Sequence, residues 1–286
     1  MKVGIQLYSV RNHMRDDPIG TIRCVAEAGY RSIEAANHNA GEDPGIGFDI
    51  PAGELKKLLD ETGARIVGCH IFPNNVEIMK SVVEYFSRLE TGYLAVPMGF
   101  FKDKADTLRQ AEGFNEVGRL CSQAGITLVY HNHFHEFQVF EGKTVFDHIM
   151  ENTDPALVKI ELDTYWAVRG GQDAVKLLER YGGRVVLIHQ KDFPGEYRAA
   201  INLIDPVNKG GLTVDMDYFT GVVKQETFTE IGAGILPIQD IINMGNAACK
   251  ADYIILEQDF SKHDELESIK ISMERFKKFS GIEWRS

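Results

Sequence analysis

The sequence is poor in cysteine, in positive charge and in long apolar runs. Its four cysteines are spread over 286 residues and form no C-x-x-C pair, so we interpret them as small buried side chains of a protein in the reducing cytoplasm. The net charge of −11 argues against nucleic acid as a partner, since an acidic chain gains nothing from phosphate backbones. No apolar run reaches the roughly 18 residues of a membrane span. The N-terminal MKVGIQLYSV meets Arg11 too early for a signal peptide.

What the chain contains is typical of a globular enzyme. Hydrophobic residues make up 44% and charged residues 26% of the sequence, and a chain of this length can bury a large core without disulfides or structural metals. No glycine-rich P-loop is present, so a substrate phosphate is not required.

Apolar runs that predict strands alternate along the chain with patterns of helical period, and no linker or change of composition interrupts them. The expected strands are residues 2–8, 31–35, 64–70, 93–96, 126–132, 157–162, 184–189 and 253–257. The expected helices are residues 18–28, 52–62, 76–89, 104–124, 144–151, 172–181, 238–248 and 265–279. Eight strand–helix units predict an α/β fold, a single (β/α)₈ TIM barrel over residues 1–286.

One segment interrupts this alternation. Residues 193–235, between the seventh strand and its helix, carry several aromatic residues and glycines but no clear barrel element. Loops of this length in compact domains are usually functional. We interpret the segment as a long insertion that acts as a lid. A surface excursion or a contact in a homo-oligomer is the alternative.

The most informative stretch is TLVYHNHFHEF, residues 127–137, where a buried strand runs into three histidines. Alternate residues of a strand point to the same side, so His131 and His133 are expected to face the same space.

Ionisable residues follow most of the other strands as well, and barrel enzymes carry their sites at these carboxyl ends. The candidates are Glu34, His70, His131, His133, Glu136, Asp163, His189 and Glu257, with Trp166, Arg169 and Lys191 at the same rim. Asp163, His189, Glu257 and one residue of the fifth strand form a carboxylate-rich set with one imidazole. Such a set suits Mn²⁺, Mg²⁺ or Co²⁺ better than a structural Zn²⁺. The alternative is a salt-bridged network without metal.

These motifs resemble the xylose-isomerase-like superfamily of metal-dependent barrels, which includes sugar isomerases and epimerases, inosose dehydratase and endonuclease IV. The similar pieces are GIQLYSVR, YHNHFHEF, ELDTYWAVRGG, IHQKD, IGAG and ILEQD, which span nearly the whole chain. The resemblance implies a sugar or sugar derivative as substrate. It also implies that Asp163, His189 and Glu257 bind a divalent metal and that Glu257 doubles as an acid or base.

The fifth strand departs from the epimerase pattern, in which a glutamate stands near the position of His131, and is similar to the HNH-type members. We expect Glu136 to be the fourth ligand, with His131 as the alternative. His131 and His133 then serve as substrate-side bases or hydrogen-bond donors. Glu34, His70, Trp166, Arg169 and Lys191 are expected to bind substrate.

The expected function is that of a sugar isomerase or epimerase that removes a proton next to a carbonyl, with Mn²⁺ as the first choice of metal and Mg²⁺, Co²⁺ or Zn²⁺ as others. The alternative is a lyase that eliminates water or an aglycone from a 3-oxo sugar or glycoside. Two further classes are an endonuclease IV-like nuclease, which the acidic charge disfavours, and a sugar-binding barrel without catalysis.

Overall fold

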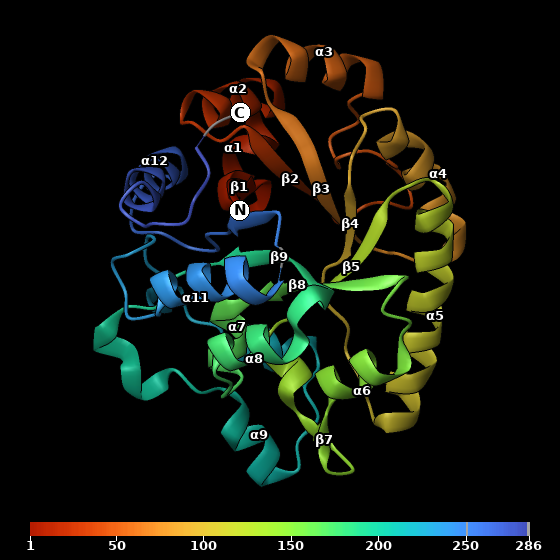
Figure 1. Ribbon diagram of the computed structural model, residues 1–286, viewed down its shortest axis with the longest axis vertical. Helices are drawn as coiled ribbons and strands as arrows, with labels where there is room; N and C mark the ends of the chain where they lie inside the picture. Colours follow the sequence, from red (N-terminus) through yellow and green to blue (C-terminus); the bar gives the residue numbers. More distant parts are fainter. Residues whose placement is uncertain (250, 285–286) are drawn as a thin grey trace.

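Eight parallel strands close into a barrel in the order β1-β10-β9-β8-β5-β4-β3-β2. The computed structural model describes residues 1–249 and 251–284, and Figure 1 shows the strands enclosed by helices. The strands are β1 (Lys2–Gln6), β2 (Ser32–Asn37), β3 (Arg65–Ile71), β4 (Tyr93–Val96), β5 (Thr127–His131), β8 (Val158–Asp163), β9 (Val185–Gln190) and β10 (Tyr253–Leu256). The closed barrel confirms the expected fold class.

Helices follow the strands and cover the barrel. The outer helices are α2 (Pro18–Glu27), α3 (Ala52–Thr62), α4 (Val76–Ser87), α5 (Lys104–Gln123), α6 (Val145–Asn152), α8 (Ala174–Tyr181), α11 (Ile238–Met244) and α12 (Glu265–Phe276). Asp17 and Asp103 cap α2 and α5 by accepting hydrogen bonds from backbone N–H groups of the first turn. Gly63 ends α3 in the left-handed conformation, with φ of 66°. None of these helices is both long and apolar enough to cross a membrane.

Several elements differ from the expected boundaries. The first strand ends at Gln6, because its side chain accepts a hydrogen bond from the backbone N–H of Tyr8 and starts a 3-10 helix, η1 (Leu7–Val10), followed by α1 (Arg11–Asp16). A small hairpin of β6 (Val139–Phe140) and β7 (Lys143–Thr144) and the short helix α7 (Thr164–Arg169) follow β5 and β8. These additions after β1, β5 and β8 all lie at the carboxyl ends of strands, where the site is built.

The segment between β9 and α11 is made of short helices, drawn in teal outside the barrel strands in Figure 1. It contains η4 (Gly195–Ala200), α9 (Ile204–Gly210), α10 (Met216–Val222) and η5 (Gln225–Thr227). Asp192 joins its two ends, since the carboxylate accepts hydrogen bonds from the backbone N–H groups of Phe193, Gly232, Gly234 and Leu236. The segment therefore leaves and rejoins the barrel at one point. Its role as a lid stays a prediction.

Candidate metal centre and active site

Four side chains at the carboxyl end of the barrel bring their ligand atoms together. His131, Asp163 and His189 lie on β5, β8 and β9, and Glu257 follows β10. One ligand atom from each lies within 4.8 Å of the others. His131 Nε2 is 3.4 Å from Asp163 Oδ2 and 3.8 Å from Glu257 Oε2, and His189 Nδ1 is 3.0 Å from the same Glu257 atom. We call these four residues the rim group.

The rim group fits a divalent cation. His131 Nδ1 donates to the carbonyl oxygen of Pro97 at 3.0 Å, which leaves Nε2 as the nitrogen that faces the carboxylates. Burial lowers the pKa of His131, so the ring stays neutral and Nε2 keeps its lone pair. This atom has no hydrogen-bond partner in the described part of the chain. Two imidazoles and two carboxylates are ligands that Zn²⁺, Mn²⁺ and related ions accept.

Lys191 supplies the positive charge that the two carboxylates face. Its Nζ lies 2.5 Å from Asp163 Oδ2, contacts Glu257 Oε2, and is 3.7 Å from Asp259 Oδ1. Burial alone would lower the pKa of Lys191, but these three carboxylates outweigh burial and raise it well above its usual value. Lys191 therefore stays protonated. Its charge in turn lowers the pKa of Asp163, against the effect of burial.

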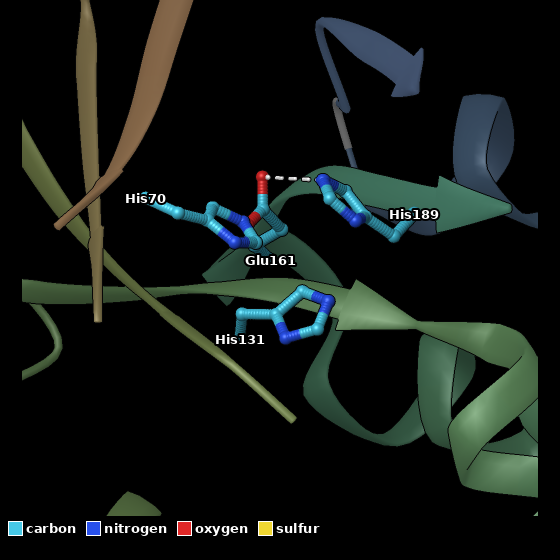
Figure 2. Close-up of side chains that lie close together, drawn as sticks. All are labelled: His70, His131, Glu161 and His189. Atoms are coloured by element: carbon cyan, nitrogen blue, oxygen red, sulfur yellow. Dashed lines mark hydrogen bonds and ion pairs between the residues drawn. The ribbon is translucent and has the colours of Figure 1, made fainter. Parts of the chain in front are cut away.

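A second set of donors lies deeper in the barrel and shares two imidazoles with the rim group. Figure 2 shows His70, His131, Glu161 and His189 turned toward one another. His70 Nε2 lies 2.8 Å from Glu161 Oε2, and His189 Nε2 lies 2.6 Å from Glu34 Oε2 and 3.3 Å from Glu161 Oε1. The two glutamates hold the inner nitrogen of His189, so its Nδ1 is directed at the rim group.

The buried carboxylates and imidazoles of this deeper set shift one another's pKa values. Burial and the neighbouring Glu161 raise the pKa of Glu34 to about 7. Burial alone would lower the pKa of His189, but Glu161 and Glu34 outweigh it and raise the pKa well above its usual value. Burial alone would raise the pKa of Glu161, but His189 and His70 outweigh burial and lower it well below its usual range.

Glu161 was not among the residues expected from the sequence, although a signal for it existed. It precedes Asp163 by two positions in β8, and the period of two places both side chains on the same side of the strand. Glu161 lies inside β8, whereas the residues expected from the sequence are those at or after the ends of the strands. Glu34 and His70, expected to bind substrate, lie in the same deep set, where their side chains contact other residues of the set.

Glu136, the expected fourth ligand, belongs to neither donor group. Its Oε1 accepts a hydrogen bond from the Tyr130 hydroxyl at 2.9 Å, and its Oε2 accepts one from the backbone N–H of His133 at 2.8 Å. The carboxylate thus closes the turn after β5. The structure brings His131, the alternative, to Asp163, His189 and Glu257 in its place.

His133 lies beside the rim group, with its ring centroid 5.0 Å from that of His131 and 5.3 Å from that of Trp166. Its Nδ1 and the Trp166 Nε1 are buried without a hydrogen-bond partner in the described part of the chain. Burial and the adjacent His131 lower the pKa of His133 well below its usual value. Phe219 of α10 packs on His133 at 5.3 Å, so residues 193–235 reach the site.

Arg169, expected to bind substrate, is 1% exposed and turned toward the 193–235 segment. Its guanidinium donates to Thr227 Oγ1 at 2.9 Å and to the carbonyl oxygens of Ala200 and Ile201 at 3.3 Å. A further hydrogen bond of 3.0 Å goes to the Tyr165 hydroxyl. The contacts of Arg169 thus support the segment rather than the rim group.

Comparison with known proteins finds the same architecture. A family model described as the xylose isomerase-like TIM barrel matches residues 22–276. Inosose dehydratase 2 of Bacillus cereus is 26% identical over 210 residues, which are 71% of this chain and 65% of that protein. The chain spans between 26% and 65% of the length of the first curated relatives.

Solved structures agree on the fold. A protein of Parabacteroides distasonis, described as a sugar phosphate isomerase/epimerase, has a TM-score of 0.78 at 23% identity and covers 99% of this chain and 95% of its own. The IOLI protein, crystallised with a zinc atom, has a TM-score of 0.72 at 14% identity and covers 98% of this chain and 100% of its own. At these identities the likeness concerns the barrel alone.

Proposed function

Because this chain belongs to the xylose isomerase-like TIM barrel family, we propose that it is a divalent-metal-dependent lyase acting on a 3-oxo sugar, a related cyclic ketone or a glycoside. The observation that carries the proposal is the rim group, in which two imidazoles and two carboxylates bring ligand atoms within 4.8 Å. Curated relatives named inosose dehydratase support elimination over isomerisation. The four free cysteines fit the cytoplasm as its location.

The ligands we propose are His131, Asp163, His189 and Glu257. A divalent ion bound there would act as a Lewis acid toward a substrate carbonyl. The second imidazole makes Zn²⁺ as suitable as the Mn²⁺ expected from the sequence. His70, Glu34 and Glu161 orient His189 from the inner side, as partners of metal-binding histidines commonly do.

The residues beside the rim group have the properties that an elimination requires. His133 is neutral because of its lowered pKa, and its unpartnered Nδ1 can accept the proton from the carbon next to the carbonyl. Lys191 is protonated and can donate a hydrogen bond to the leaving oxygen as its carbon–oxygen bond breaks. The Trp166 Nε1–H is free to bind a further substrate oxygen.

The isomerase or epimerase reaction expected from the sequence begins with the same proton removal. It ends with return of a proton to carbon, whereas elimination ends with loss of water or of an aglycone. The names of the curated relatives favour elimination.

The segment 193–235 is proposed as the lid of this site. Phe219 contacts His133 and Trp166 through its ring, at centroid distances of 5.3 and 5.9 Å. It therefore covers the side of the site where proton removal is proposed, and a covered site excludes water from reactive intermediates.

The test is incubation of Mn²⁺- or Zn²⁺-loaded protein with an inosose, a 3-oxo-glucoside and a free ketohexose in D₂O, followed by mass spectrometry. Elimination predicts a product lighter by water or by the aglycone. A product of unchanged skeleton that carries deuterium would support the isomerase instead. His133→Asn is expected to retain metal binding and lose turnover, by about 10²–10⁴-fold if His133 is the base.

A further inference from the structure

The short helix α7 joins the rim group to the 193–235 segment. Asp163 caps its first turn, since Oδ1 accepts a hydrogen bond of 2.7 Å from the backbone N–H of Trp166. The other oxygen, Oδ2, lies 2.5 Å from Lys191 Nζ and 3.4 Å from His131 Nε2. One carboxylate is therefore both a rim-group donor and the N-cap of α7. A cation that restrains this carboxylate also restrains the first turn of the helix, because both oxygens belong to one planar group.

Two further contacts fix the start of α7 to the strands that carry the rim group. The Thr164 hydroxyl donates to the carbonyl oxygen of His189 at 3.1 Å. Asn132, which follows β5, donates to the carbonyl oxygen of Asp163 and accepts from its N–H, both at 3.1 Å. All four residues are buried. The start of α7 is thus connected to β5, β8 and β9.

The far end of α7 holds the segment through Arg169, its last residue. The guanidinium donates to Thr227 Oγ1 at 2.9 Å, near the end of the segment. It also donates to the carbonyl oxygens of Ala200 and Ile201 at 3.3 Å, near the beginning. The carbonyl oxygen of Arg169 accepts a hydrogen bond of 2.8 Å from the N–H of Leu203. A displacement of the last turn of α7 would strain all these contacts together.

Trp166 lies between these two ends of α7 and beneath the segment. Its ring centroid is 5.9 Å from those of Phe219 and Phe228 and 5.3 Å from that of His133. The helix therefore carries the ring on which the segment packs as well as the arginine that holds the segment.

We propose that Arg169 is a positioning residue that couples occupation of the rim group to closure of the 193–235 segment, with α7 as the connecting element. The inference rests on the proposed function, because it takes the rim group as the metal site and the segment as the lid. Its physical basis is a contiguous chain of buried hydrogen bonds from Asp163 to Thr227. Such coupling is reciprocal, so the metal stabilises the closed segment by the factor by which the closed segment raises metal affinity. The lid is thereby held most firmly over a loaded site.

The experiment measures amide hydrogen exchange of residues 193–235 by mass spectrometry, with and without Zn²⁺, and Zn²⁺ affinity by isothermal titration calorimetry. Exchange reports how often the segment opens. We expect Zn²⁺ to slow exchange in the segment by about fivefold or more, as coupled sites typically show. Exchange in α3, an outer helix on β2 and β3, is the internal reference and should change less.

Variants separate coupling from simple support of the segment. Arg169→Gln is expected to remove the effect of Zn²⁺ on exchange and to weaken Zn²⁺ binding by the same factor, although the guanidinium bonds to the segment and not to the ion. Arg169→Lys should retain part of both effects, because an ammonium group can keep some of the hydrogen bonds. Arg198→Gln is the matched control, since Arg198 is an exposed residue of the same segment. A residue that only supported the segment would, when replaced, speed exchange equally with and without Zn²⁺ and leave the affinity unchanged.

The outcomes distinguish this inference from the proposed function. Zn²⁺ binding to the unsubstituted protein without slower exchange in the segment would overturn the inference and leave the metal site intact. An undiminished effect of Zn²⁺ in Arg169→Gln would overturn it as well, and Arg169→Lys provides the comparison if Arg169→Gln does not fold. Absence of Zn²⁺ binding to the unsubstituted protein would refute the rim group as a metal site, and with it both proposals.

Discussion

Asp192 is the residue on which the attachment of the 193–235 segment depends most. It is 1% exposed. Oδ1 accepts hydrogen bonds from the N–H groups of Phe193 and Leu236 at 2.8 and 3.1 Å, and Oδ2 accepts from those of Gly232 and Gly234 at 2.9 Å each. One side chain therefore satisfies four backbone donors at the two ends of the segment.

Asp192→Asn replaces one of these oxygens by an NH₂ group, which cannot accept and is brought against two N–H donors. A hydrogen bond to a charged group contributes about 1.5–3 kcal/mol, and a buried donor left without a partner has a similar cost. Losing two such bonds predicts a decrease of about 3–6 kcal/mol in the free energy of unfolding. This is a large part of the total stability of a typical domain.

Urea denaturation followed by circular dichroism measures the change. Asp205→Asn is the matched control, because Asp205 is an exposed residue of the same segment that pairs with Lys209 on the surface, and we expect no measurable effect. Limited proteolysis should cut Asp192→Asn within residues 193–235 faster than the control. A variant within about 1 kcal/mol of the unsubstituted protein, with unchanged proteolysis, would refute this account of the segment.

Two further predictions concern the rim group and a surface carboxylate. His131→Ala should weaken Mn²⁺ or Zn²⁺ binding by at least about a hundredfold, since mutation of residues that merely contact a ligand already lowers metal affinity about 10–100-fold. Glu136→Gln should leave the affinity nearly unchanged. If calorimetry instead shows that Glu136→Gln weakens binding and His131→Ala does not, Glu136 is the ligand. For Asp147, hydrogen bonds from the Tyr181 hydroxyl and other donors and the charge of Arg180 outweigh burial and lower the pKa. Its stabilising effect should be complete above the unfolded pKa of about 3.9 and be lost as the pH falls through the lower folded value. Asp147→Asn should thus be about 1–3 kcal/mol less stable at pH 7, and urea denaturation at pH 3 should show a smaller difference.

The barrel was predictable because its signal is repeated eight times. Each strand is a short apolar run followed by a polar residue, and a single uncertain boundary does not change the count. The end of β1 shows what the pattern omits. Residues 7 and 8 continue the apolar run, but the side chain of Gln6 bonds to the backbone of Tyr8 and turns the chain into a 3-10 helix. That turn leads into α1 and places the Arg11 guanidinium over the rings of Tyr8 and Phe260.

Glu136 and Glu161 differ in whether the period of a strand sets the direction of the side chain. Glu136 was expected as a ligand because a carboxylate suits the metal, yet it lies five residues beyond His131, the last residue of β5, in a 3-10 turn where the period of two no longer holds. Glu161 lies inside β8, where the period does hold, and it points to the same side as Asp163. Within a strand the period decides the direction of a side chain, and beyond its end the local hydrogen bonds decide.

The same period explains why one site has two levels. Asp163 and Glu161 belong to one strand, two residues apart, so their carboxylates are at different depths in the barrel. His189 lies on the neighbouring strand, paired in register with Asp163. Its two ring nitrogens face different levels, since Nε2 lies near Glu34 and Glu161, and Nδ1 lies near Glu257. The deep carboxylates thus keep the outer nitrogen directed at the position proposed for the metal. Imidazole suits position 189 because its two nitrogens lie at different edges of one rigid ring, so one nitrogen can face the deep carboxylates while the other faces the rim group.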